Sequence, residues 1–222
     1  MKTEKLPYNN VHISRLHYMG TYNILERIND GYAFYETMDE IFIIQKVVNE
    51  KQGKDAYEVF SKIFKYEDTT TKMVVKDLMT STHDKSYLHH KYDDIEILQY
   101  YVVYAYNRRL DKTKPIGITG LYANYDSNTA HIAWFGVLKN YRKLGIGTKM
   151  LELTEAVAIL QGYKHIEVFS HYNVYESPAH DFYINYGFEM FDIIEPKEDS
   201  INEDSTNELE FHFTKSLLTS NS

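Results

Sequence analysis

The feature that most constrains the fold is a strand, a short glycine-containing loop and an amphipathic helix in direct succession between residues 129 and 162. Residues 129–138 form the second arm of a predicted hairpin with 115–125, because Asp126-Ser127-Asn128 favours a tight reversal. From Gly145 onward, apolar side chains recur at alternating spacings of four and three residues, which predicts one apolar helix face. Strand, loop and helix in this order are typical of an α/β protein.

The loop itself is Arg142-Lys143-Leu144-Gly145-Ile146-Gly147. Unpaired backbone N–H groups and the positive end of the helix dipole meet there, which favours a phosphate as ligand. The two glycines would let the backbone approach a pyrophosphate closely, and Arg142 and Lys143 add positive charge. The spacing lacks the third glycine of a dinucleotide-binding fingerprint, and no P-loop motif occurs.

The rest of the chain divides near residue 94 by its hydrophobic pattern. Before it, a first strand is predicted at 11–18, followed by helical spacing over 22–28, 38–48, 56–64 and 73–79. After it, strands are predicted at 95–106, 165–169, 188–194 and 208–215, with a second helix at 177–186. We therefore expect one domain over 1–222, with 1–94 as a mostly helical, substrate-side elaboration and 95–215 as the core.

Composition excludes several functions. The net charge of -8 argues against a nucleic-acid partner. No run of 18 apolar residues and no signal-like start occur, so we expect no membrane segment and a cytoplasmic location. Without cysteine, acyl transfer cannot pass through a cysteine thioester. The eight carboxylates between Asp192 and Glu210 are interpreted as a solvated loop or as an attraction for a cationic substrate.

Two motifs together resemble the GNAT superfamily of N-acetyltransferases. The loop matches the R-x-x-G-x-G signature and follows Trp134-Phe135-Gly136-Val137, as in that family. Residues 179–188, from Ala179 through Phe182-Tyr183 to Gly187-Phe188, are similar to the family's second conserved helix, A-x-x-F-Y-x-x-x-G-F. The resemblance covers about 95–215. It implies an α/β fold with a mixed central sheet of about seven strands, splayed at the cofactor site and flanked by helices.

The resemblance also implies acetyl-CoA as cosubstrate and direct attack by a primary amine in a ternary complex. The pantetheine arm would pair with one strand, the pyrophosphate would meet residues 142–148, and the backbone N–H of Val137 would bind the oxyanion. The implied cofactor-binding residues are Phe135, Gly136, Val137, Arg142, Lys143, Leu144, Gly145, Ile146, Gly147 and Thr148.

Two residues are candidates for proton transfer. Tyr183 matches the tyrosine that protonates the departing thiolate in many members, although a core aromatic would give the same pattern. His131 occupies the place of a glutamate that some members carry before the loop, and it is the candidate base, directly or through water, although a lone strand histidine is more often structural. Glu167 and Tyr122 are the fallback candidates. Glu176 departs from the family, which often has an asparagine there.

The acceptor stays open between a small cationic amine, including polyamines, and a protein amine. A homodimer is also left open. Two other readings compete with the enzyme: a non-catalytic acyl-CoA sensor, since a histidine replaces the family's carboxylate, and a structural adaptor that uses its helical first part. A metal site at His83, His89 and His90 is not expected, because neither cysteine nor an H-E-x-x-H spacing accompanies them.

Overall fold

The computed structural model describes residues 4–5, 12–13, 32–36, 39–65, 67–81, 95–124, 126–171, 176–195 and 209–217. These form the following elements: β1 (Glu4–Lys5), β2 (His12–Ile13), β3 (Tyr32–Glu36), β4 (Glu40–Lys46), α2 (Glu50–Ile63), α3 (Thr69–Ser81), β5 (Ile95–Asn107), β6 (Lys112–Asn124), β7 (Thr129–Val137), the 3-10 turn η2 (Lys139–Tyr141), α5 (Ile146–Leu160), β8 (His165–His171), α6 (Ser177–Tyr186), β9 (Glu189–Ile194) and β10 (Glu210–Ser216).

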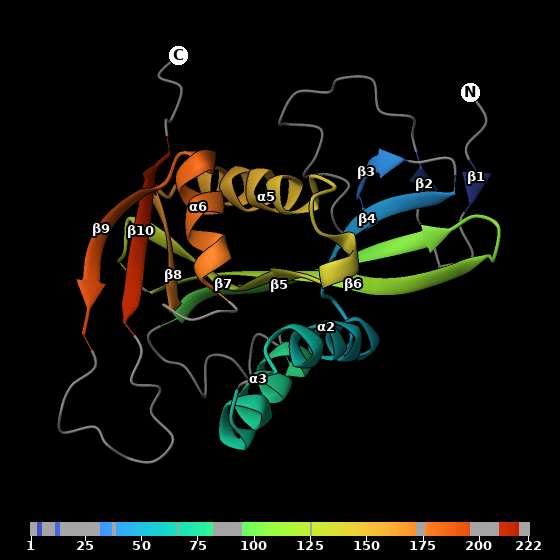
Figure 1. Ribbon diagram of the computed structural model, residues 1–222, viewed down its shortest axis with the longest axis horizontal. Coiled ribbons are helices and arrows are strands. Elements are labelled where there is room, and N and C mark those ends of the chain that lie inside the picture. Colours follow the sequence, from blue (N-terminus) through green and yellow to red (C-terminus); the bar gives the residue numbers. More distant parts are fainter. Residues whose placement is uncertain are drawn as a thin grey trace.

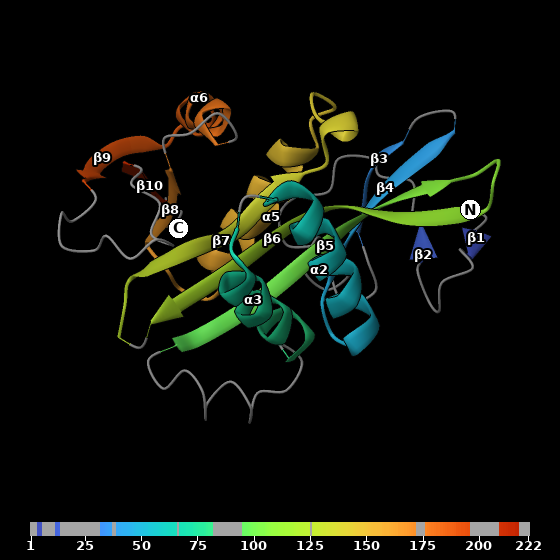
Figure 2. The same cartoon turned by 60° about the horizontal axis from the view of Figure 1, so that its bottom comes forward.

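One eight-stranded sheet in the order β3-β4-β5-β6-β7-β8-β10-β9 organises the molecule, and β1 and β2 form a separate small sheet. Neighbouring strands of the large sheet are antiparallel except for β7 and β8, which pair in parallel. In Figure 1, α5 and α6 lie on one face of the sheet and α2 and α3 on the other. Figure 2 shows α2 and α3 crossing β5, β6 and β7. The predicted fold class, a mixed sheet flanked by helices, is confirmed.

The predicted elements after residue 94 all exist, with ends displaced by a few residues. In the first part, the helices expected at 56–64 and 73–79 are α2 and α3. Of the strand expected at 11–18, the described part is β2. The helix expected at 22–28, the connection at 81–94 and the carboxylate-rich segment after Glu195 lie outside the described residues, apart from the ends of the latter two.

The helix expected at 38–48 is wrong, because this segment forms the inner strand β4 between β3 and β5. Its four central residues, Ile41, Phe42, Ile43 and Ile44, are all buried. A strand covered on both faces has a continuous apolar run, which hydrophobic periodicity cannot distinguish from a buried helix. The first part of the chain therefore contributes strands as well as helices.

Two hydrophobic cores fill the two faces of the sheet. The α5 core lies under α5 and α6 and includes Met150 and Phe213, both fully buried. The α2 core lies under α2 and α3, where Phe60 packs edge-on against Trp134 with ring centroids 4.8 Å apart. Each core buries large side chains that would otherwise face water, which is the main favourable term in folding. The sheet is thus fixed from both sides.

Candidate active site

The parallel pair β7 and β8 separates partway along its length. Cα pairing runs through Thr129↔His165 and Ala130↔Ile166 and ends at His131↔Glu167. Beyond that point β7 carries an irregularity, with a shift in its register to β6 and a positive φ of 50° at Trp134. A bulge bends a strand and increases its twist. The sheet is therefore splayed where the sequence predicted the coenzyme site.

Val137, at the end of β7, directs its backbone groups into this splay. The next residue, Leu138, donates its N–H to the carbonyl of Ile116 beside β6, at 2.8 Å. Because hydrogen-bonding direction alternates along a strand, the N–H and C=O of Val137 point away from β6 and toward β8. The Val137 carbonyl accepts a bond from Arg142 Nε at 2.9 Å, which agrees with this direction. The N–H is suitably placed for an oxyanion.

The predicted phosphate loop lies at the start of α5. Gly145 is the N-cap in a left-handed conformation, with φ 76°, and it makes no side-chain capping bond. Lys143 is also left-handed, with φ 64°. Such alternation turns successive N–H groups toward one point and forms an anion-binding concavity. The first-turn N–H groups of Ile146, Gly147 and Thr148 have no intrahelical acceptor, so they are available to a phosphate.

The side chains of the loop divide between packing and solvent. Arg142, Lys143 and Leu144 are exposed, whereas the Ile146 side chain is buried in the α5 core. Gly147 approaches aromatic rings, because a Cβ there would lie 3.2 Å from Phe182 Cζ. A side chain at this position would push the Phe182 ring aside by a few tenths of an ångström, so glycine suits the close packing of the loop against α6. Exposed cations and open N–H groups fit the pyrophosphate of a coenzyme.

At Gly136, on β7, the face of the sheet toward α2 is covered by that helix. A Cβ at Gly136 would lie 3.0 Å from Ile63 Cγ2 and 3.7 Å from Phe64 Cζ. Phe135, in contrast, packs toward α6, with its ring 5.9 Å from Phe182 and 6.0 Å from Tyr183. The segment proposed to hold the pantetheine arm is thus bordered by α2 on one face of the sheet and by α6 on the other.

Tyr183 is buried within α6, with only 3% of its surface exposed. Its ring packs against Phe188 and Phe213 in the α5 core. Burial raises the pKa of Tyr183, and the carboxylate of Glu176 raises it further. The phenol therefore stays protonated at neutral pH, as a general acid must before it acts, while the same burial makes it a weaker acid than a free tyrosine.

His131, Glu167 and Tyr122 lie beside one another on three adjacent strands. Tyr122 pairs with His131 across β6 and β7, and their rings stack at 4.9 Å. His131 Nδ1 is 3.7 Å from Glu167 Oε2 on β8. Burial lowers the pKa of His131, and Glu167 partly opposes this effect. The structure brings together the three side chains that the sequence offered as alternative bases.

This trio lies at the closed end of the splay. His131 precedes Val137 by six residues, which corresponds to about 20 Å of extended strand, somewhat less across the bulge. A proton acceptor must reach its donor within hydrogen-bonding distance or through water. His131 can therefore serve an amine near Val137 only through a chain of water molecules.

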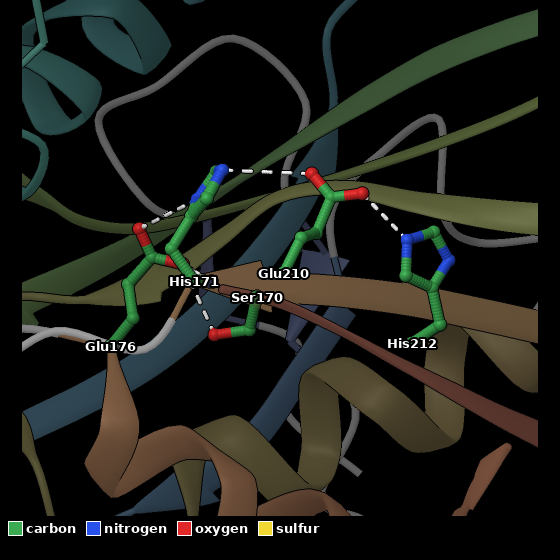
Figure 3. Close-up of polar contacts among 5 residues, drawn as sticks. All are labelled: Ser170, His171, Glu176, Glu210 and His212. Atoms are coloured by element: carbon green, nitrogen blue, oxygen red, sulfur yellow. Dashed lines mark hydrogen bonds and ion pairs between the residues drawn. The ribbon is translucent and has the colours of Figure 1, made fainter. Parts of the chain in front are cut away.

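The sequence assigned no catalytic role to the side chains that meet at the open end of the splay. His171, the last residue of β8, lies between Glu176 and Glu210, and Figure 3 shows the contacts that join them. His171 ends β8, Glu176 directly precedes α6, and Glu210 begins β10, 39 residues after His171. No sequence motif contains all three residues. Strand pairing, His171↔Glu210, brings Glu210 to His171, whereas Glu176 follows His171 by only five residues.

Metal binding finds no support in the part of the chain that is described, since no three His, Asp or Glu side chains there could hold an ion. The three histidines His83, His89 and His90 lie outside it. In the same part, no helix has both the length and the apolar character needed to cross a membrane.

The sequence profile of the acetyltransferase (GNAT) family matches residues 71–188, more than half of the chain. The chain therefore belongs to the acetyltransferase (GNAT) family, as the two motifs predicted. Acetyl-CoA is the cosubstrate of this family. The left-handed loop, the open N–H groups of α5 and the splayed strand are the features here that fit such a ligand.

Solved structures with the same fold agree in overall architecture. A GNAT-family protein from Desulfovibrio desulfuricans is 13% identical with a TM-score of 0.59, over 80% of this chain and 99% of the other. The ribosomal-protein-S5-alanine acetyltransferase of Vibrio fischeri is 11% identical with a TM-score of 0.58, over 84% of this chain and 97% of the other. A GNAT-family acetyltransferase from Staphylococcus aureus is 20% identical with a TM-score of 0.53, over 79% of this chain and 99% of the other. At these identities the likeness concerns the fold. No protein of curated function matches the sequence.

Proposed function

We propose that the protein transfers the acetyl group of acetyl-CoA to a primary amine by direct attack in a ternary complex. The observation that carries this proposal is the splay of β7 from β8 beyond His131↔Glu167, next to the N-terminus of α5. It exposes the backbone of β7 for strand-like pairing with the pantetheine arm. Phe135, Gly136 and Val137 would hold that arm, and residues 142–148 would hold the pyrophosphate.

The residues around the splay have distinct roles in this proposal. The N–H of Val137 stabilises the oxyanion that forms when the amine attacks the thioester carbonyl. Arg142 holds the Val137 carbonyl through Nε, and so links the phosphate loop to the end of β7. Tyr183 gives its proton to the departing thiolate. His131 stays a candidate base that acts through water, with Glu167 and Tyr122 beside it.

The acceptor in this proposal is a small cationic amine or polyamine, with a protein amine as the alternative. The negative charges of Glu67, Glu167, Glu176 and Glu210 would attract a cationic substrate. We propose that the protein acts in the cytoplasm, where such amines occur. A homodimer is part of the proposal as well. The outermost strand β9 leaves Met190, Phe191, Ile193 and Ile194 about half exposed, which suits pairing with a second copy.

One assay tests the proposed function. The full chain is incubated with acetyl-CoA and a panel of amines: spermidine, butane-1,4-diamine, a lysine-containing peptide and a peptide with a free N-terminus. Release of free thiol and mass spectrometry of the products measure acetyl transfer, and calorimetry measures coenzyme binding. Coenzyme binding without transfer to any amine would favour the sensor. Failure to bind coenzyme A would overturn both readings and leave the adaptor.

A further inference from the structure

Trp134 lies at an irregularity of β7 in a backbone conformation that tryptophan rarely adopts. Between the pairs Ile118↔Gly136 and Gly120↔Ala133, β6 advances by two residues and β7 by three. One extra residue on one of two paired strands is a β-bulge. Trp134 has φ 50°, which is a genuine outlier for a bulky residue, whereas glycine takes such a conformation freely. The strand therefore holds a tryptophan where the backbone would suit a glycine.

The extra residue changes which backbone groups of β7 face the proposed coenzyme site. Before it, the Ala133 carbonyl faces β6, because a Cβ on Gly120 would lie 3.0 Å from its oxygen. After it, the N–H of Leu138 bonds beside β6. Strict alternation from Ala133 would point Val137 toward β6 and Leu138 toward β8, and the extra residue reverses the two. The bulge thus turns the N–H of Val137 into the splay.

Three side chains at the end of α2 hold this segment from one face of the sheet. The indole of Trp134 packs edge-on against the rings of Phe60 and Phe64, with centroids 4.8 and 5.3 Å away. The N–H of Phe64 bonds to the carbonyl of Phe60 at 2.9 Å, which fixes the last turn of the helix. Ile63 covers Gly136, since a Cβ there would lie 3.0 Å from Ile63 Cγ2. Strained backbone persists where surrounding contacts over-determine it, and α2 supplies such contacts.

The place of Trp134 distinguishes it from other residues with positive φ. In the described part of the chain, the other non-glycine examples are Asp111, Asp126 and Lys143, and all three lie in turns, where the chain reverses. Trp134 lies inside a strand, directly before Phe135 of the segment proposed to hold the pantetheine arm. Strain at such a place points to a function of the site rather than to a chain reversal.

We propose that Trp134 is a positioning residue for acetyl-CoA, an inference that rests on the proposed function. The rings of Phe60 and Phe64 hold Trp134 in its left-handed conformation, and the resulting bulge directs the backbone of Phe135 and Val137 toward the coenzyme. Because the indole packs on α2, it acts through the backbone of β7. The first part of the chain, which the sequence linked to the acceptor, thereby takes part in coenzyme binding as well.

Three substitutions of Trp134 separate conformation from packing. Trp134→Phe keeps a ring against α2 and should bind coenzyme A within about threefold of the wild type. Trp134→Val should bind it about 30-fold more weakly, because a β-branched residue resists positive φ and no ring holds it there. Trp134→Gly loses the ring but accepts φ 50°, so it should lose only about fivefold. Calorimetry with coenzyme A, below the thermal midpoint of each variant, measures the affinities.

The order of the last two variants is a readout that a purely structural role would not give. If Trp134 only filled space in the α2 core, Trp134→Val would bind coenzyme A at least as well as Trp134→Gly, because it buries more apolar surface. The control is Val75→Ala, which removes a buried side chain of α3 from the same core. It should lower the thermal midpoint and leave the coenzyme affinity at the wild-type level.

The failures of the two proposals are distinguishable. A wild type that binds no coenzyme A would overturn the proposed function, and the positioning role with it. With a wild type that binds, equal affinities for the three Trp134 variants, or tighter binding by Trp134→Val than by Trp134→Gly, would overturn the positioning role alone.

A smaller change keeps the test decisive should Trp134→Val not fold. Phe64→Leu leaves Trp134 in place and removes one of the two rings that hold it. It should weaken the binding of coenzyme A about fivefold, because the left-handed conformation is then held less firmly. An unchanged affinity in Phe64→Leu would overturn the positioning role.

Discussion

The two sides of the splay are built in different ways. On the side of α5, the proposed coenzyme contacts come mainly from backbone: the left-handed Gly145, the N–H groups of the first helical turn and the N–H of Val137. At the end of β8, in contrast, the polar groups are side chains such as His171 on β8 and Glu210 on β10, which segments far apart in the sequence supply. A backbone site depends on local conformation, whereas a side-chain site depends on packing over long distances.

The largest effect should follow from loss of packing on the α2 side of the sheet. Phe60, on α2, is fully buried against the rings of Phe64 and Trp134. Phe60→Ala should lower the free energy of unfolding by about 3 to 5 kcal/mol, through lost transfer energy and a cavity. Chemical denaturation measures this change. Met73→Ala, whose side chain is 68% exposed on α3, is the control and should change stability little.

The second effect concerns the centre of the site. Tyr183→Phe keeps the packing of a buried ring and removes the phenolic proton. We expect kcat to fall at least about tenfold while the affinity for coenzyme A is kept. Steady-state kinetics and calorimetry separate the two quantities. An unchanged kcat would return Tyr183 to a purely structural role in the α5 core.

A third and smaller effect should distinguish backbone from side-chain recognition. Gly145→Ala adds a Cβ with no atom within 4 Å, but at φ 76°, which costs a residue with a side chain about 1 to 2 kcal/mol. The free loop can then relax away from the binding conformation, so acetyl-CoA should bind about five to thirty times more weakly.

Gly162→Ala is the matched control for that change. Gly162 lies after the other end of α5, has φ 88° and also has open space around it. Its substitution should lower the thermal midpoint similarly and leave coenzyme affinity unchanged. Equal losses of affinity in both variants would mean that the loop conformation does not select the ligand.

The smallest effect is on the pH dependence of stability. Burial lowers the pKa of His131 in the folded protein, so the unfolded chain binds a proton more readily as the pH falls. The stability that neutral His131 contributes is present above its ordinary pKa near 6.5 and is lost as the pH falls through the folded pKa. His131→Gln should therefore show a smaller fall in the denaturation midpoint between pH 7 and 5 than the wild type.

The sequence predicted the elements after residue 94 because their patterns are local. Each has a period or a turn signal that neighbouring residues determine, such as the spacing from Ile146 to Val157 or the reversal at 126–128. The helix predicted at 38–48 was wrong because the apolar run of this segment reflects burial on both faces of the sheet. That burial comes from packing against distant parts of the chain, as in the α5 core that Phe42 and Ile44 join, and no local pattern reports it.

By itself the sequence predicted the residues of the proposed coenzyme contacts, from Trp134 through the loop 142–147 to Tyr183. Those contacts depend on glycine conformation and on the start of a helix, both of which are encoded within a few residues. Only the tertiary structure decided which histidine lies at the open end of the splay. His131 and His171 both occur on strands, and the register of β7, β8 and β10 alone distinguishes the closed end from the open one.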